Sequence, residues 1–377
     1  LLGYLETRVQ KGLDPEGGLF QLYDSFVYSL PYELKKVINT ELTDISVARQ
    51  ADNIRARVEN SHGILKDCFQ QSVVQLGQAL DPAVAGTRIF PDFSARPDQS
   101  VVGNGADELI ALIAAAAFEP GDEVIVPEPS FEPYTIGATL AGARIVASPL
   151  TAYDIDLEDV RRRLTDRTKA VMLCSPHNPA TTIIRRAALL GFLDSLGTDP
   201  PLVVLDEAYR EFCDDPEYPD GVALLGRYPR LIVLRTFSKI AGLAGLRVGY
   251  AVANAETIDR LNRVRAPYNV NRLGQVAALA ALEDEEHQER TRRLVLEERA
   301  FLTAELTRRG YRFPRSHANF LLVRVDDAPA LRARLLKSGI LVRDGASVGF
   351  PGHLRFSVGR RETNEQLLAL LEPSGPE

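Results

Sequence analysis

The stretch "LIVLRTFSKIAGLAGLRVGYAVA", residues 231–253, places two short apolar runs on either side of a segment that contains a single lysine. The runs at 231–235 and 248–253 are nearly continuous in hydrophobicity, which is typical of strands buried on both faces of a sheet. Between them, Lys239 is surrounded by hydroxyl residues and small apolar residues, a composition unlike that of an exposed helix face. We therefore expect Lys239 to be shielded from water, where an amine loses its proton more readily.

Further apolar runs of similar length precede this stretch, and segments with apolar residues at three- and four-residue spacing separate them. The expected strands cover 122–127, 143–148, 169–174 and 202–206, and the expected helices cover 106–118, 156–164 and 186–196. This alternation predicts an α/β fold with a mostly parallel central sheet covered by helices.

After Asn254 the pattern changes to long charged helical segments, such as 284–310, followed by three short apolar runs at 318–325, 340–344 and 353–359. This change predicts a smaller α+β domain at the C-terminus. The predicted boundaries are 1–100 for an N-terminal segment with weak periodicity, 101–265 for the large domain, 266–371 for the C-terminal small domain and 372–377 for a tail.

Composition excludes several classes of function. The 44 basic and 51 acidic residues give a net charge of −7, and no run of lysine or arginine suits nucleic acid or an anionic membrane surface. No apolar stretch reaches the roughly 18 residues that a membrane span needs. Cys68, Cys174 and Cys213 show no metal-binding spacing, so we expect no metal site, reduced thiols and a cytoplasmic location.

Polar residues follow three of the expected strands at their carboxyl ends, where ligands bind in an open parallel sheet. Asn178 follows 169–174, Asp206 ends 202–206, and Lys239 follows 231–235. A carboxylate at the end of an apolar strand requires a cationic partner or hydrogen bonds. Asp206 is expected either to pair with a pyridinium nitrogen or to cap the next helix, and the residue alone does not favour one over the other.

Other segments offer contacts to an anion and to a planar ring. Arg247 and Lys239, separated by small residues, suit a phosphate and a nearby carbonyl. The stretch "VGNGADELI" (102–110) opens a helix whose amides attract a phosphate, although such turns are common. Phe131 and Tyr134 are each expected either to stack on a planar ligand or to belong to the core.

Taken in order, these motifs resemble the fold-type I pyridoxal-phosphate enzymes, within them the class I/II aminotransferases, and most of all the histidinol-phosphate aminotransferase group. The likeness extends from about Val101 to Leu371. It rests on "GADE" (105–108), "SPHNPA" (175–180), "DEAY" (206–209), "TFSKIAGLAGLRVGY" (236–250) and "HLRFSVG" (353–359). It implies a homodimer that uses pyridoxal 5'-phosphate, with a cofactor-binding large domain and an N-terminal segment that contributes to the small domain and the dimer contact.

The resemblance also implies residue roles. Lys239 would hold the cofactor as a Schiff base and move a proton, Asp206 would pair with the pyridine nitrogen, and Tyr209 would hydrogen-bond the phenolic oxygen of the ring. The further implied cofactor contacts are Asn178 at the phenolic oxygen, Phe131 against the ring, and Gly105, Ala106, Asp107, Thr236, Ser238 and Arg247 around the phosphate. Arg355 would bind the substrate carboxylate, with Asn319 beside it.

The implied reaction transfers an amino group between glutamate or 2-oxoglutarate and a second substrate, histidinol phosphate or a related amino acid. A decarboxylase or cyclase of the same fold, similar to threonine-phosphate decarboxylase, is the alternative. A member that binds without catalysis is disfavoured because Lys239, Asp206, Arg247 and Arg355 are all present. Residues 1–100 depart from the family pattern: Phe90 stands where a tyrosine is expected, and "NTELTD" (39–44) poorly matches the usual loop over the substrate.

Overall fold

The computed structural model describes residues 97–372, and every structural statement below concerns these residues. They belong to a compact unit that spans Val74–Glu377. The predictions made for residues 1–96, which include Cys68 and Phe90, and for 373–377 lie outside the described residues.

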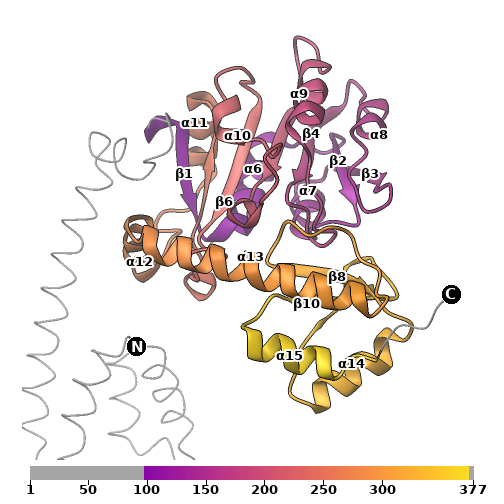
Figure 1. Ribbon diagram of the computed structural model, residues 1–377. Coiled ribbons are helices and arrows are strands. Elements are labelled where there is room, and N and C mark those ends of the chain that lie inside the picture. The colour runs from indigo at the N-terminus through magenta and orange to yellow at the C-terminus, as the bar shows by residue number, and fades with distance from the viewer. Residues whose placement is uncertain (1–96, 373–377) are drawn as a thin grey trace, which may run out of the picture. The chain divides into compact units, whose positions relative to one another are not determined.

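A seven-stranded sheet forms the larger part of the described chain, with strand order β1-β7-β6-β5-β4-β2-β3 (Figure 1). The strands are β1 (Ser100–Gly103), β2 (Glu123–Glu128), β3 (Arg144–Pro149), β4 (Thr168–Cys174), β5 (Leu202–Asp206), β6 (Leu231–Thr236) and β7 (Gly249–Val252). The neighbours from β3 to β6 run parallel, whereas β7 is antiparallel to both β6 and β1. The expected mostly parallel sheet is confirmed, and β1 is an addition to the six strands predicted from the sequence.

Helices cover both faces of this sheet because alternate residues of each buried strand point in opposite directions. On one face, α6 (Gly105–Ala117), α7 (Pro133–Leu140) and α11 (Ala255–Val264) share a core with Val124 and Val126. On the other face, α8 (Leu157–Arg162), α9 (Arg186–Asp194) and α10 (Gly221–Leu224) share a core with Ile125. The middle strands are thus apolar on both sides, and their polar residues are confined to their ends.

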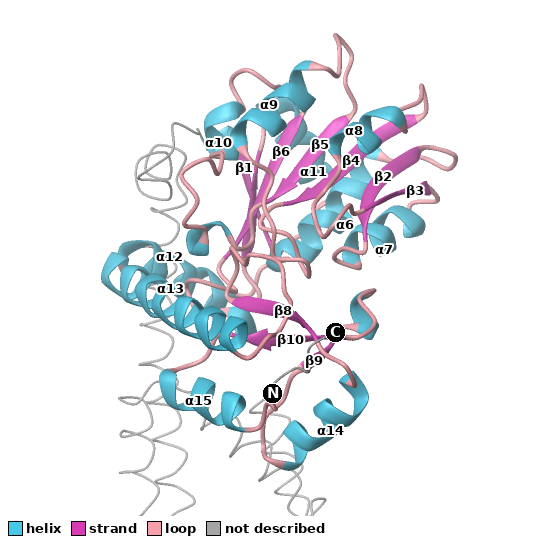
Figure 2. Cartoon of the chain, turned by 45° about the vertical axis from the view of Figure 1, so that its right-hand side comes forward, coloured by secondary structure: helices cyan, strands magenta, loops and turns pink. Residues whose placement is uncertain are grey.

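A second, three-stranded antiparallel sheet has the order β8-β10-β9. Its strands are β8 (Phe320–Arg324), β9 (Arg343–Asp344) and β10 (His353–Ser357), and the helices around it are α13 (Glu285–Arg308), α14 (Ala328–Lys337) and α15 (Arg361–Ala369) (Figure 2). Leu302 and Leu306 of α13 pack with Leu321 of β8 in the core of this part. The small α+β portion is confirmed, while its proposed boundary at 265/266 stays a prediction.

The remaining elements are short connections and one helix between the two sheets in sequence. These are α12 (Arg272–Glu283) and the 3-10 turns η1 (Pro97–Gln99), η2 (Arg210–Phe212), η3 (Ala244–Leu246) and η4 (Ala346–Val348). Within residues 97–372, no helix combines the length and the apolar character that crossing a membrane requires.

Candidate active site

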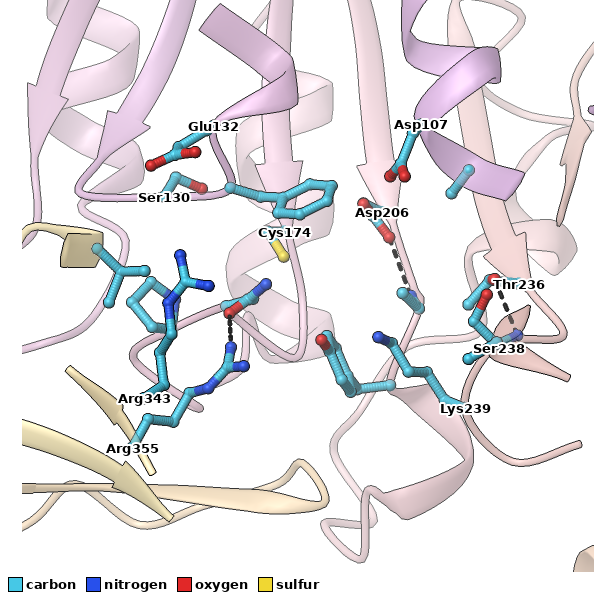
Figure 3. Close-up of a pocket in the computed structure, with 18 of the residues that line it drawn as sticks. Asp107, Ser130, Glu132, Cys174, Asp206, Thr236, Ser238, Lys239, Arg343 and Arg355 are labelled. Carbon is cyan, nitrogen blue, oxygen red and sulfur yellow. Dashed lines mark hydrogen bonds between the residues drawn. The ribbon is translucent and has the colours of Figure 1, made fainter. Parts of the chain in front are cut away.

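A cavity of about 270 Å³ lies at the carboxyl ends of β4, β5 and β6, and residues from the small sheet also line it (Figure 3). Most of the residues predicted from the sequence line it: Ala106, Asp107, Phe131, Asn178, Asp206, Tyr209, Thr236, Ser238, Lys239, Arg247 and Arg355. Gly105 begins α6 directly before Ala106, and the main-chain oxygen of Asn319 accepts the Val358 amide at 2.9 Å. Neither Gly105 nor Asn319 is a lining residue, and the substrate role of Asn319 stays a prediction.

Lys239 follows β6, which ends at Thr236. Its Nζ lies 5.0 Å from the centre of the Tyr209 ring. Burial, followed by the charge of Arg355, lowers the pKa of Lys239, while Asp206 acts in the opposite direction. An amine with a lowered pKa is more often unprotonated and is therefore a better nucleophile and base.

Asp206 is 3% exposed at the end of β5. Its Oδ2 accepts a hydrogen bond from the Tyr134 hydroxyl at 2.7 Å, and its Oδ1 accepts one from the Ala208 amide at 3.0 Å. The alternative that Asp206 caps the next helix is wrong, because η2 has Tyr209 as its N-cap residue. A buried carboxylate at the cavity wall suits a protonated ring nitrogen instead.

An anion cradle lies where α6 begins. Asn104, the N-cap residue, makes no capping bond through its side chain, and the first amides of a helix have no partner within the helix. Arg247 reaches this terminus: its Nη2 donates to Asp107 Oδ2 at 2.7 Å, and its Nη1 lies 3.5 Å from Ser238 Oγ. Backbone amides, a hydroxyl and a guanidinium together suit a phosphate group.

A larger residue at Gly105 would displace the Arg247 side chain from this cradle. Gly105 has φ +82°, and a Cβ atom there would lie 2.4 Å from Arg247 Nη2. Arg247 itself has the left-handed φ of 54°, which a non-glycine residue adopts only at some cost. Thr236 lines the cavity, and its Oγ1 accepts the Ser238 amide at 3.1 Å and donates to the Val248 oxygen at 3.3 Å. Its contact with a phosphate stays a prediction.

The small sheet supplies two arginines to the opposite side of the cavity (Figure 3). Arg355 Nη1 donates to Asn178 Oδ1 at 2.9 Å, and its guanidinium lies 4.6 Å from the centre of the Phe320 ring. Arg343, which we did not predict, lines the same cavity and is the Cα partner of Arg355 in the pairing of β9 with β10. The sequence contained a signal, since the apolar runs 340–344 and 353–359 each carry an arginine.

Aromatic and thiol groups complete the wall. Phe131 lines the cavity and also packs against the core of the large sheet, so its contact with a planar ring stays a prediction. Tyr134, which is 1% exposed, belongs to the core. Cys174 at the end of β4 is also a lining residue, and burial raises the pKa of its thiol to about 12. Within the described residues, no group of three or more His, Cys, Asp or Glu side chains could hold a metal ion.

These groups fit pyridoxal phosphate. The Lys239 amine suits its aldehyde, the buried Asp206 carboxylate suits its ring nitrogen, and the cradle around Arg247 suits its phosphate. The strongest observation is the cradle, where the missing side chain of Gly105 admits the guanidinium beside helix amides that have no partner within the helix.

Comparison with known proteins agrees with this chemistry. The family model for aminotransferases of class I and II matches residues 91–371. This chain is a class I and II aminotransferase. As a member of that family it is a pyridoxal-phosphate-dependent transaminase.

Similar proteins carry more specific names. The histidinol-phosphate aminotransferase of Symbiobacterium thermophilum is 43% identical over 278 residues, which are 73% of this chain and 76% of that protein. The histidinol-phosphate aminotransferase of Caldicellulosiruptor saccharolyticus is 39% identical over 286 residues, which are 76% of this chain and 80% of that protein.

Solved structures show the same fold. The histidinol-phosphate aminotransferase of Clostridium acetobutylicum has a TM-score of 0.69 at 26% identity, covering 81% of this aminotransferase and 93% of that chain. The aspartate aminotransferase of Thermotoga maritima has a TM-score of 0.69 at 26% identity, covering 78% and 80% of the two chains.

Proposed function

We propose that this aminotransferase transfers an amino group between glutamate or 2-oxoglutarate and histidinol phosphate or a related amino acid. The names of its relatives support this pair of substrates. The observation that carries the proposal is the pairing of Arg343 with Arg355 on adjacent strands at the cavity. Two guanidinium groups at one wall favour a substrate that carries a phosphate or a carboxylate close to the carbon bearing the reacting amine.

The position of each residue in the cavity indicates its role in the reaction. The cofactor supplies an electron sink for the bond that breaks at the substrate carbon bearing the amine. Lys239 provides the amine that holds the cofactor and moves the proton at that carbon. Asp206 maintains a negative charge beside the ring nitrogen, and Arg355 orients the substrate against the wall that Asn178 completes. The family membership and the relatives favour transamination over the decarboxylation or cyclisation considered above.

We also propose that the enzyme works as a homodimer in the cytoplasm. Exposed apolar residues before and within α12 support the dimer: Tyr268 is 98% exposed, Leu273 61% and Val276 37%. Covering these side chains in a subunit contact would remove apolar surface from water. The expected absence of nucleic-acid and membrane partners stays a prediction.

The substrate proposal is tested by half-reactions of the cofactor-loaded enzyme. Glutamate, histidinol phosphate, histidinol and leucine are mixed with it separately, and conversion of the cofactor to its amine form is followed by visible absorbance. We expect conversion by glutamate and by histidinol phosphate, with histidinol much weaker. If leucine and histidinol react as well as histidinol phosphate, the substrate assignment is wrong. If no amino donor changes the spectrum, the transamination assignment is wrong.

An arginine variant sharpens the same test. Arg343→Gln should raise KM for histidinol phosphate by roughly 10-fold or more while changing KM for histidinol little, because only the phosphate needs the lost charge. Arg332→Gln, an exposed arginine on α14, is the matched control and should change neither. If Arg343→Gln changes KM equally for histidinol phosphate and for histidinol, Arg343 does not bind the phosphate.

A further inference from the structure

Tyr134 makes a buried contact to Asp206 that the site described above leaves without a role. The residue is the second of α7 and lies three positions after Phe131. Its hydroxyl donates to Asp206 Oδ2 at 2.7 Å across 72 positions of sequence. Both side chains are almost wholly inaccessible to water, at 1% and 3% exposed. In such surroundings each polar group depends on the other, because water is not there to replace a lost bond.

The two oxygens of Asp206 are each held by one donor from the chain. Oδ1 accepts the Ala208 amide at 3.0 Å within the loop after β5, and Oδ2 accepts the Tyr134 hydroxyl from the helix side. A carboxylate oxygen has two lone pairs, so each oxygen keeps one for a further donor. Without Tyr134, the Ala208 amide would be the one remaining hydrogen-bond donor to this carboxylate among residues 97–372, so the terminal torsion of Asp206, which is intrinsically broad, would be less restricted.

We propose that Tyr134 is a positioning residue, which holds the Asp206 carboxylate ionised and oriented toward the ring nitrogen of the cofactor. The inference rests on the cofactor of the family and is independent of which substrate the enzyme uses. Tyr134 itself does not line the cavity, so it acts through Asp206.

The charges around Asp206 support this role. Burial raises the pKa of Asp206, and the hydrogen bonds from Tyr134 and Ala208 lower it. Of the more distant groups that face it, Lys239 lowers this pKa and Asp107 raises it. Cys174 and Tyr209 also face it, and the pKa of each is raised, mainly by burial, so they stay neutral.

The sign of the effect follows from these contacts. Removing the Tyr134 hydroxyl would raise the pKa of Asp206, so the carboxylate would protonate at a higher pH. A protonated Asp206 no longer provides the negative charge that a protonated ring nitrogen requires. Cofactor binding should therefore weaken at the acid end of the pH range, and earlier in the variant than in the parent enzyme.

One short segment carries both this residue and the predicted ring contact. Phe131 and Tyr134 meet edge to face, with ring centres 5.6 Å apart and an angle of 80° between their planes. The side chain that lines the cavity and the hydroxyl behind the carboxylate are thus placed together by the turn that begins α7.

The test compares Tyr134→Phe with Tyr228→Phe. The Tyr228 hydroxyl also donates to a carboxylate at 2.7 Å, that of Asp194, but at an exposed site. The dissociation constant of pyridoxal phosphate is measured by titrating the apoenzyme from about pH 5 to about pH 9, with the unfolding midpoint measured alongside. We expect Tyr134→Phe to weaken binding by roughly 10-fold near neutral pH and to move the acid-side midpoint up by about 1 pH unit. Tyr228→Phe should leave both values unchanged.

A second background shows whether Tyr134 acts through Asp206. In Asp206→Asn the ionisable group is gone, so adding Tyr134→Phe should neither move an acid-side midpoint nor weaken binding by more than about 2-fold. The proposal is overturned if Tyr134→Phe lowers the unfolding midpoint but leaves the cofactor affinity and its pH dependence unchanged. It is equally overturned if the 10-fold loss persists in Asp206→Asn. Both readouts are binding measurements, so they stand whether or not the proposed substrates are correct.

Discussion

Replacing Arg235 with methionine should destabilise the enzyme more than any exposed arginine replacement. Arg235, within β6, is 1% exposed, and its partner Glu207 is fully buried. Nε and Nη2 of Arg235 donate to Glu207 Oε2 at 2.9 and 2.7 Å, and Nη2 also donates to Asp220 Oδ1 at 2.9 Å. Methionine approximates the length of the arginine side chain but leaves the Glu207 charge inside the protein.

The magnitude follows from what remains around Glu207. Removing one partner of a buried ion pair lowers the unfolding free energy by about 3–5 kcal/mol. Glu207 would keep the Gly221 amide at 2.8 Å and Arg210 Nε at 3.4 Å, which favours the lower end, about 3 kcal/mol. The matched control is Arg227→Met. Arg227 forms an ion pair with Asp194 at 2.7 Å, and the two side chains are 62% and 47% exposed, respectively. Such an exposed pair contributes about 1 kcal/mol or less.

Urea unfolding of the two variants, with and without saturating cofactor, measures the difference. Because Glu207 adjoins Asp206, Arg235→Met should also weaken cofactor binding. The double variant Arg235→Met with Glu207→Leu should recover most of the lost stability, since it removes the unpaired charge. An equal loss in Arg235→Met and Arg227→Met would refute this reasoning.

Three other substitutions or conditions test separate parts of the structure. Gly105→Ala should weaken cofactor binding by roughly 10-fold, because its Cβ would displace Arg247, whereas Gly191→Ala, with open space around its Cβ, should not. Burial lowers the pKa of His177 to about 3, below its usual 6.5, so the unfolded chain binds more protons between these values. The unfolding free energy should thus fall by about 1.4 kcal/mol per pH unit on acidification through that window, and less steeply in His177→Asn. With its raised pKa of about 12, the Cys174 thiol should resist alkylation at neutral pH until the protein is unfolded, as peptide mass spectrometry would show.

The central strands and the residues at their ends could be predicted from the sequence for a simple physical reason. Strands buried on both faces must be apolar throughout, so β5 appears as an uninterrupted run that ends at Asp206. Parallel strands bring their carboxyl ends to one edge, which predicts from the sequence that Asn178, Asp206 and Lys239 lie together. The order of the motifs then indicated the family.

Contacts between segments that are distant in the sequence could not be predicted in the same way. Arg235 was included in an apolar run without a partner, because Glu207 is 28 positions away and comes directly after the neighbouring strand β5. Tyr134 could be a stacking or a core residue until the start of α7 placed its hydroxyl against Asp206. β1 was missed because its four residues, SVVG, carry too short a pattern to separate from the following turn.

The most direct test of the central claim is to locate the bond between the protein and its cofactor. The cofactor-loaded enzyme is reduced with borohydride, digested, and mapped by mass spectrometry. We predict loss of the visible absorption band and one modified peptide that carries the label on Lys239, with no label in Lys239→Ala. A label on another lysine, or a protein that takes up no pyridoxal phosphate, would contradict the assignment of this site.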